Sequence, residues 1–152
     1  MLPEIKTILL AMAPINELRG TIPIAIMLFG LAPLKALFLS WLGNMLPIVF
    51  LLWFWKYLSK HWASKNKLIE KFLKWIFQRT RKRFYKKYSL YGDLALILLV
   101  AIPLPFTGAW TGSIAAFLFG ISYGRSLGLI SIGALIAGVV ITLITTGICS
   151  FL

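Results

Sequence analysis

The chain has 152 residues, of which 60% are hydrophobic and only 13% are charged, and its mean hydropathy is +0.89. Because a soluble domain is about half apolar and about a quarter charged, this composition excludes an ordinary water-soluble globule and predicts one membrane domain, residues 1–152. The chain has one cysteine and one histidine, which argues against a disulfide and a metal site. It has no Gly-rich nucleotide loop and no paired carboxylates, so we expect no cofactor and no enzymatic activity.

Residues 5–33 are predicted to form a re-entrant hairpin. The uncharged run at residues 7–16 has 10 residues, whereas a straight span needs about 20 apolar residues. The run is interrupted at Pro14, meets a polar stretch and resumes as an apolar segment at Pro23. Because proline breaks a helix or occupies its first turn, the pattern favours a half-helix, a break, and a second half-helix that begins near Gly20.

A membrane span and a basic linker follow. Residues 34–57 contain an uncharged run of 20 residues and are predicted to cross the bilayer. Residues 58–93 form the linker, and twelve of the 16 basic residues lie between Lys56 and Lys87. Apolar residues at helical spacing predict an amphipathic helix on the inner leaflet. By the positive-inside rule the linker is cytoplasmic and both termini lie outside, in a multi-pass protein of the cell membrane. We interpret the linker charge as anchoring to anionic lipid, with substrate gathering as the alternative and nucleic-acid binding rejected.

A second re-entrant hairpin is predicted at residues 94–123, and a second span at residues 125–152. The middle of this hairpin holds four residues that break helices: Pro103, Pro105, Gly108 and Gly112. Four glycines in the second span predict close helix packing and a homo-oligomer: Gly128, Gly133, Gly138 and Gly147.

The two halves match when the sequence is shifted by 90 places. Residues 28–30, Leu-Phe-Gly, then align with residues 118–120, and Lys35 aligns with Arg125. One crossing per unit turns the second copy upside down. We therefore predict an all-α integral membrane protein of two inverted repeats, each a re-entrant helical hairpin plus one transmembrane helix, joined by the basic amphipathic helix. The alternative is four ordinary spans, of which the first two would be too short or would bury two charges in lipid.

The two breaks are the candidate site, because irregular backbone at membrane depth is tolerated only inside protein or beside a wet cavity. Apart from Lys6 near the start of the first hairpin, Glu17 and Arg19 are the only charged residues inside either hairpin, and intramembrane charges are functional candidates by default. We expect Arg19 to bind an anionic group and Glu17 to carry a proton or coupling cation. The alternative is an ion pair that only locks the fold. The helix that begins after each break would add backbone N–H donors that favour an anion.

The candidate substrate- or ion-binding residues are Asn16, Glu17, Arg19, Gly20, Thr21, Thr107, Gly108, Trp110 and Thr111. The prolines expected to shape the hairpins are Pro14, Pro23, Pro103 and Pro105. For the Trp110 ring two roles remain open, namely stacking on a substrate and packing between the hairpins.

Two motifs at the breaks resemble a known family. Residues 17–23, Glu-Leu-Arg-Gly-Thr-Ile-Pro, resemble a signature of the small multidrug export proteins, and residues 102–112 resemble the second signature of that family. The resemblance covers nearly the whole chain and implies a membrane transporter of amphipathic drugs. The family is similar in architecture to the DedA membrane proteins, which implies a lipid carrier that bears a phosphate.

We therefore expect a transporter, proton- or ion-coupled, that moves a small amphipathic substrate or a phosphate-bearing lipid carrier through a cavity between the hairpins. Its expected partners are membrane lipids, this substrate, a proton or cation, and a second copy of the chain. The alternative is a membrane assembly or lipid-organising protein that transports nothing. In that case the hairpins would meet in a dry, tightly packed contact.

Overall fold

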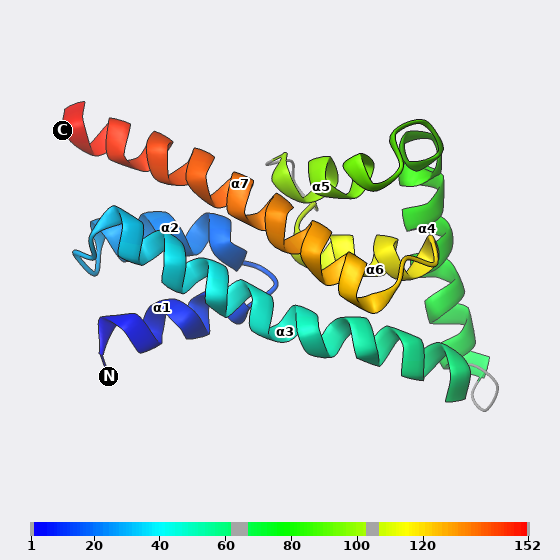
Figure 1. Ribbon diagram of the computed structural model, residues 1–152. Coiled ribbons are helices and arrows are strands. Elements are labelled where there is room, and N and C mark those ends of the chain that lie inside the picture. The colour runs from blue at the N-terminus through cyan, green and yellow to red at the C-terminus, as the bar shows by residue number, and fades with distance from the viewer. Residues whose placement is uncertain (1, 62–66, 103–106, 152) are drawn as a thin grey trace.

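The computed structural model describes residues 2–61, 67–102 and 107–151, and within them all regular secondary structure is helical (Figure 1). The helices are α1 (Pro3–Met12), α2 (Glu17–Met27), α3 (Pro33–His61), α4 (Lys67–Tyr91), α5 (Asp93–Ala101), α6 (Ala109–Leu118) and α7 (Tyr123–Phe151). Helices α1 and α2 form one hairpin and α5 and α6 another. Pro103 and Pro105, which were predicted to shape the second hairpin, lie outside the described residues.

The four hairpin helices are short, with 9 to 11 residues each. At about 1.5 Å per residue each is about 15 Å long, roughly half the thickness of a hydrocarbon core. Helix α1 has Pro3 at its first position and ends at Met12, before the extended Ala13. This end follows from Pro14, because the residue before a proline disfavours helical angles.

The second limb of the first hairpin begins earlier than expected. Helix α2 starts at Glu17, and Pro23 lies inside it rather than in its first turn. The expected start near Gly20 and the expected first-turn role of Pro23 were therefore wrong. The reason is local, because the Glu17 N–H already donates to the Ala13 carbonyl at 2.9 Å and starts the helical turn there. Pro23 has no N–H to donate, and the helix continues through it.

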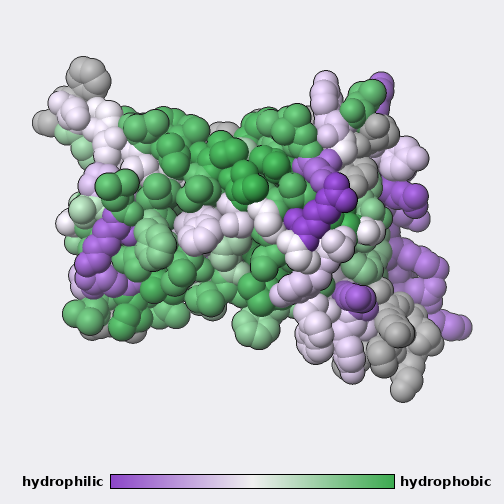
Figure 2. Space-filling model, viewed as in Figure 1, coloured by the Kyte–Doolittle hydropathy of each residue, from purple (hydrophilic) through white to green (hydrophobic). Residues whose placement is uncertain are grey.

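Helices α3 and α7 have 29 residues each. Residues 33–58 and 123–150 are long and apolar enough to cross a membrane, by length and composition. Helix α3 runs toward α4, whereas α7 runs away from it, so the two long helices are antiparallel (Figure 1). Figure 2 shows a broad apolar surface over the middle of the molecule, with hydrophilic residues concentrated at the end where α4 lies.

The structure repeats with the period that the sequence predicts. The bounds of α3 and α7 differ by 90 positions at both ends, and the pattern of buried and exposed side chains at residues 31–44 recurs position for position at 121–134. Lys35 pairs with Glu4 of α1 at 2.7 Å. In the same way, the Arg125 Nε atom lies 2.6 Å from the Asp93 carboxylate of α5. Each long helix is thus tied to the first limb of its own hairpin by a basic residue near its start.

Glycines allow each long helix to approach its own hairpin. A Cβ atom on Gly43 would lie 2.5 Å from the Ile8 carbonyl oxygen of α1, and one on Gly133 would lie 2.8 Å from the Ile97 carbonyl oxygen of α5. Gly138 instead packs against the Leu37 side chain of α3, the other long helix. The predicted close packing at Gly133 and Gly138 therefore occurs within one chain, whereas a Cβ on Gly128 or Gly147 would meet nothing within 4 Å. The homo-oligomer stays a prediction.

Helix α4 has two apolar stripes. Leu73 is buried, and Phe77 packs against Phe117 of α6 with ring centroids 5.4 Å apart. In the first half of this helix, Leu68, Phe72 and Trp75 are exposed and follow one another at helical spacing. One stripe therefore docks α4 on the second hairpin. The other leaves an apolar face beside the basic residues, as expected of a helix that lies on a membrane surface.

Candidate functional site

The two hairpins meet tip to tip in the middle of the molecule, and Glu17 forms one half of the contact. The Trp110 backbone N–H donates to Glu17 Oε1 at 3.4 Å, and the Ala109 backbone N–H joins the same contact. These two residues open α6, which has no acidic residue in its first turn and no side-chain cap. Glu17 therefore supplies, from the other hairpin, the negative charge that a helix N-terminus favours.

Arg19 forms the other half of the contact. Its Nη2 donates to the Val100 carbonyl at 2.9 Å and to the Ile102 carbonyl at 3.1 Å. These carbonyls lie at the C-terminal end of α5, which has no basic residue in its last turn. Arg19 Nη1 lies 3.3 Å from the Thr107 hydroxyl, which itself donates to the Ile102 carbonyl at 3.0 Å. The guanidinium thus satisfies the free carbonyls and the negative dipole of a helix end.

The backbone around Glu17 is strained. Glu17 has φ of 41°, the only positive value among the non-glycine residues that the structure describes. Left-handed angles are uncommon for such a residue and cost about 1–3 kcal/mol where the surroundings enforce them. Strain of this kind concentrates at binding sites and moving contacts. Its location at the one buried carboxylate between the hairpins supports a functional role for Glu17.

A small cavity of about 10 Å³ lies at this contact. Its lining includes both charged residues, Gly108 and Asn44 of α3. Asn44 is 2% exposed, and its amide oxygen has no hydrogen-bond partner within the described part of the chain. The sequence analysis missed Asn44 because it stands inside a long apolar run and carries no charge. The available signal was its position, since a polar amide in the middle of a predicted span is costly unless it is satisfied.

The other predicted residues have mixed positions. Thr21 is fully buried, and its hydroxyl donates to the Glu17 carbonyl at 2.6 Å, within its own helix. Thr107 and Gly108 belong to the contact through Arg19 and Glu17. The Trp110 ring packs on the apolar core, and its indole nitrogen is buried without a partner in the described residues. The cavity lining does not include the remaining candidates: Pro14, Asn16, Gly20, Pro23 and Thr111.

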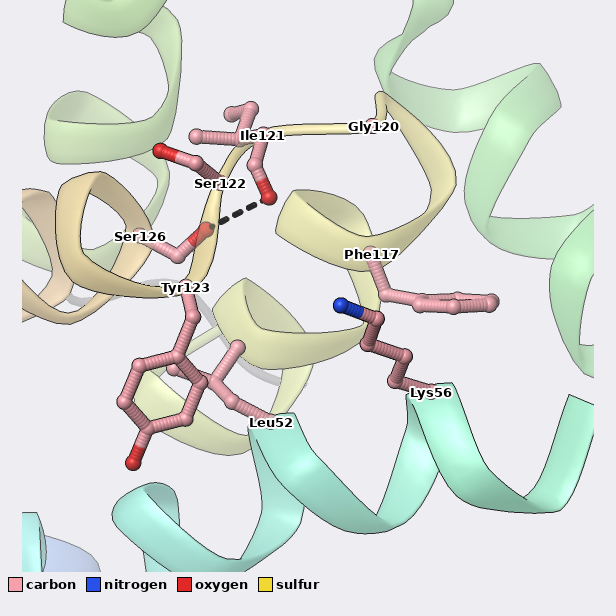
Figure 3. A pocket seen from close by; sticks show the side chains of 8 residues that line it. All are labelled: Leu52, Lys56, Phe117, Gly120, Ile121, Ser122, Tyr123 and Ser126. Atoms are coloured by element: carbon pink, nitrogen blue, oxygen red, sulfur yellow. Dashed lines mark hydrogen bonds between the residues drawn. The ribbon is translucent and has the colours of Figure 1, made fainter.

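A larger cavity of about 260 Å³ lies between α3 and the α6–α7 turn (Figure 3). The Lys56 ammonium group points into it from α3, beside the ring of Phe117. Ser122 and Ser126 also line it, and the Ser126 hydroxyl donates to the Ile121 carbonyl at 3.3 Å. The cavity thus combines a cation and hydroxyl groups with an apolar wall. Sequence analysis placed Lys56 at the cytoplasmic end of the first predicted span, where the basic block begins, and gave no signal for this cavity.

The fold and site define a helical membrane protein in which two charged residues of one helical hairpin close the helix ends of another. A sequence profile described as "Putative small multi-drug export protein" matches residues 17–140, and the chain belongs to this family. The match includes both hairpin tips and both long helices up to residue 140. Comparisons with curated proteins and with solved structures give no match.

Proposed function

We propose that this protein is a membrane transporter whose two hairpins form a gate in the middle of the bilayer. The observation that carries the proposal is the contact of Glu17 with the start of α6 and of Arg19 with the end of α5. Each charge lies against a helix end that bears the opposite partial charge. While it is formed, this contact closes the path between the hairpins. When it opens, it exposes two helix ends and two charged side chains to the path.

The repeat supports a topology for this gate. We propose that the hairpins enter the bilayer from opposite sides, with α3 and α7 as antiparallel spans and α4 on the cytoplasmic surface. The antiparallel long helices, the half-bilayer length of each hairpin helix and the basic charge of α4 are consistent with this arrangement. An inverted repeat of this kind exposes its central site to one side at a time.

The charges favour an anionic head group on the substrate. Once the contact opens, Arg19 and the N-terminus of α6 present positive charge to the path, whereas Glu17 is the one carboxylate there. The cavity at Lys56 adds a second cation near the α4 end of the molecule. We therefore propose a small amphipathic substrate with a phosphate-bearing head, and a proton carried by Glu17 as the coupling ion. A cationic amphipath, as the family description suggests, is the competing substrate class.

Transport by purified protein in liposomes tests the proposal. One arm measures movement of a fluorescent prenyl phosphate between leaflets, by quenching with a membrane-impermeant reductant. The second arm measures uptake of ethidium, a cationic dye, under an imposed pH gradient. We expect Glu17→Gln and Arg19→Ala to abolish transport, and we expect the prenyl phosphate to move faster than the dye.

Matched controls exist in the same chain. Glu4→Gln and Arg125→Ala remove the same residue types from surface ion pairs outside the gate and should transport normally. If both Glu17→Gln and Arg19→Ala transport at the wild-type rate, the gate assignment is wrong. If ethidium moves and the prenyl phosphate does not, the substrate is a cation.

A second candidate function is a membrane assembly or lipid-organising protein that transports nothing. The observation that favours it is the small volume at the hairpin contact, about 10 Å³. This alternative also predicts that Glu17 and Arg19 pair with each other. In the structure each of them instead contacts a helix end of the other hairpin. This function would be supported if the wild-type protein moves neither probe and if cysteines placed at the hairpin contact cannot be labelled from either side of the membrane.

A further inference from the structure

Asn44 places an unsatisfied amide beside the two charges of the gate. Its side chain projects from the middle of α3, is 2% exposed, and lines the same cavity as Glu17 and Arg19. A buried amide oxygen without a donor is unfavourable, and such groups are normally satisfied by protein or by ordered water. Because no donor lies within reach in the described residues, the missing partner is expected to lie in the cavity.

The cavity restricts what this partner can be. About 10 Å³ is roughly the volume that the centre of one water molecule needs, so one water fits there. Sodium would need several oxygen ligands in its coordination shell. Here the side chains in the lining that carry oxygen are those of Glu17 and Asn44, and the lining also includes the cationic Arg19. A second positive charge next to Arg19 is disfavoured.

We propose that Asn44 and Glu17 hold a single water molecule in this cavity, and that this water is the route by which a proton reaches or leaves Glu17. An amide suits this position because its oxygen accepts and its nitrogen donates hydrogen bonds. It can therefore orient the water toward a carboxylate or toward a carboxylic acid. Asn44 is a positioning residue in this account, and Glu17 carries the proton. The proton route rests on the proposed function, whereas the water site does not.

The site occurs once, although the fold repeats. The position that corresponds to Asn44 in the second half is Ala134, which lines the same cavity and is 2% exposed. Likewise, the positions that correspond to Glu17 and Arg19 are Thr107 and Ala109. Within the described lining, the first repeat therefore supplies the groups that can handle a proton, and Arg19 is the other charged residue there.

Water-edited solid-state NMR on the full chain in lipid bilayers tests the water site directly. The sequence has three glutamates and three asparagines, so selective labelling gives three carboxyl signals and three side-chain amide signals. The Glu17→Gln and Asn44→Leu variants assign the two signals of interest. We expect rapid magnetisation transfer from water to the Glu17 carboxyl and the Asn44 amide in the wild type. We expect the transfer to Glu17 to be lost in Asn44→Leu, which fills the cavity.

Ser40→Ala is the matched control. Ser40 lies one turn before Asn44, is fully buried, and its hydroxyl also has no partner in the described residues, but it does not line the cavity. Transfer to Glu17 should persist in this variant. Should Asn44→Leu fail to insert, Asn44→Met gives the comparison with a more flexible apolar side chain, with loss of the transfer to Glu17 as the expected result.

Three results would overturn the inference. The first is no water transfer to either side chain in the wild type. The second is unchanged transfer to Glu17 in both Asn44 variants. The third is a movement of the Asn44 and Glu17 signals when sodium chloride replaces choline chloride at constant ionic strength, which would indicate a sodium site. In transport assays we expect Asn44→Leu to slow movement of the prenyl phosphate and to lose its acceleration by an imposed pH gradient. If the wild type moves no probe, the proposed function fails while the NMR result still decides the water site.

Discussion

Glu17 lies so close to Gly108 that a Cβ atom on Gly108 would stand 2.2 Å from Glu17 Oε2. No real pair of atoms of this kind approaches so closely, so the carboxylate occupies the space that a side chain would need. The backbone of Gly108 (φ 156°, ψ −168°) is also in a region that is essentially restricted to glycine. Two independent constraints thus require glycine where α6 begins, and one of them comes from the other hairpin.

Gly108→Ala should therefore open the hairpin contact. The added methyl group displaces the Glu17 carboxylate from the start of α6, and the strained backbone adds to the cost. We expect a destabilisation of about 1–3 kcal/mol, the usual range for overpacking, together with loss of transport. Thermal unfolding in detergent micelles and the prenyl phosphate assay measure the two effects.

Gly124→Ala is the control for that experiment, because a Cβ on Gly124 would meet nothing within 4 Å and its backbone has no positive φ. It should unfold and transport like the wild type. A Gly108→Ala protein that matches Gly124→Ala in both measurements would mean that Glu17 does not lie against Gly108 in the membrane.

Arg19→Ala should cost stability as well as transport. The substitution leaves the Val100 and Ile102 carbonyls without the guanidinium that donates hydrogen bonds to them, and an unsatisfied buried acceptor costs about 1–3 kcal/mol. Arg19→Lys should recover part of this loss. The compact ammonium group can donate to one of the two carbonyls but lacks the planar fork of the guanidinium that reaches both. The free energy of unfolding, measured by titration with a denaturing detergent, gives the comparison.

Arg125→Ala sets the scale for that measurement. Arg125 forms an exposed ion pair with Asp93, and such pairs contribute about 0–1 kcal/mol. An Arg19→Ala variant no less stable than Arg125→Ala would show that the cap on α5 contributes no more than a surface pair.

The sequence analysis anticipated the hairpin tips because prolines, glycines and two isolated charges interrupt otherwise apolar runs. It placed Glu17 and Arg19 at the site but assigned them to a substrate or to each other. Their contacts with the ends of α5 and α6 depend on the approach of segments more than 80 residues apart, which no local pattern encodes. Asn44 was missed for a related reason, since its neighbours along the chain are apolar and its partners lie on other helices.

The repeat explains why so much of the fold was predictable while the site was not. In each half, one long helix packs against a hairpin. The bounds of the long helices, the basic residues at their starts and their glycine contacts therefore recur. The site depends on the differences between the halves. Glu17, Arg19 and Asn44 all lie in the first half, and the second half contributes helix ends and small residues to the same contact.

Lys56→Gln should weaken binding of an anionic substrate without affecting the gate. The Lys56 ammonium group points into the larger cavity, whose lining shares no residue with the small cavity at the hairpin contact. Since Lys56 is partly in contact with solvent, we expect a modest effect, an apparent affinity for the prenyl phosphate about two- to fivefold weaker. The concentration dependence of transport measures it, with the maximum rate unchanged. An unchanged affinity would remove Lys56 from the substrate path.

The topology can be tested at two positions that the repeat makes equivalent. Lys35 and Arg125 each lie near the start of a long helix and pair with the first limb of their own hairpin. In an inverted repeat these positions lie on opposite sides of the membrane. In a Cys149→Ser background, Lys35→Cys should react with a membrane-impermeant maleimide from outside intact cells. Arg125→Cys should react only after the membrane is permeabilised, as should Lys71→Cys on α4. Labelling of Lys35→Cys and Arg125→Cys from the same side would contradict the inverted repeat and favour an arrangement in which both hairpins enter from one surface.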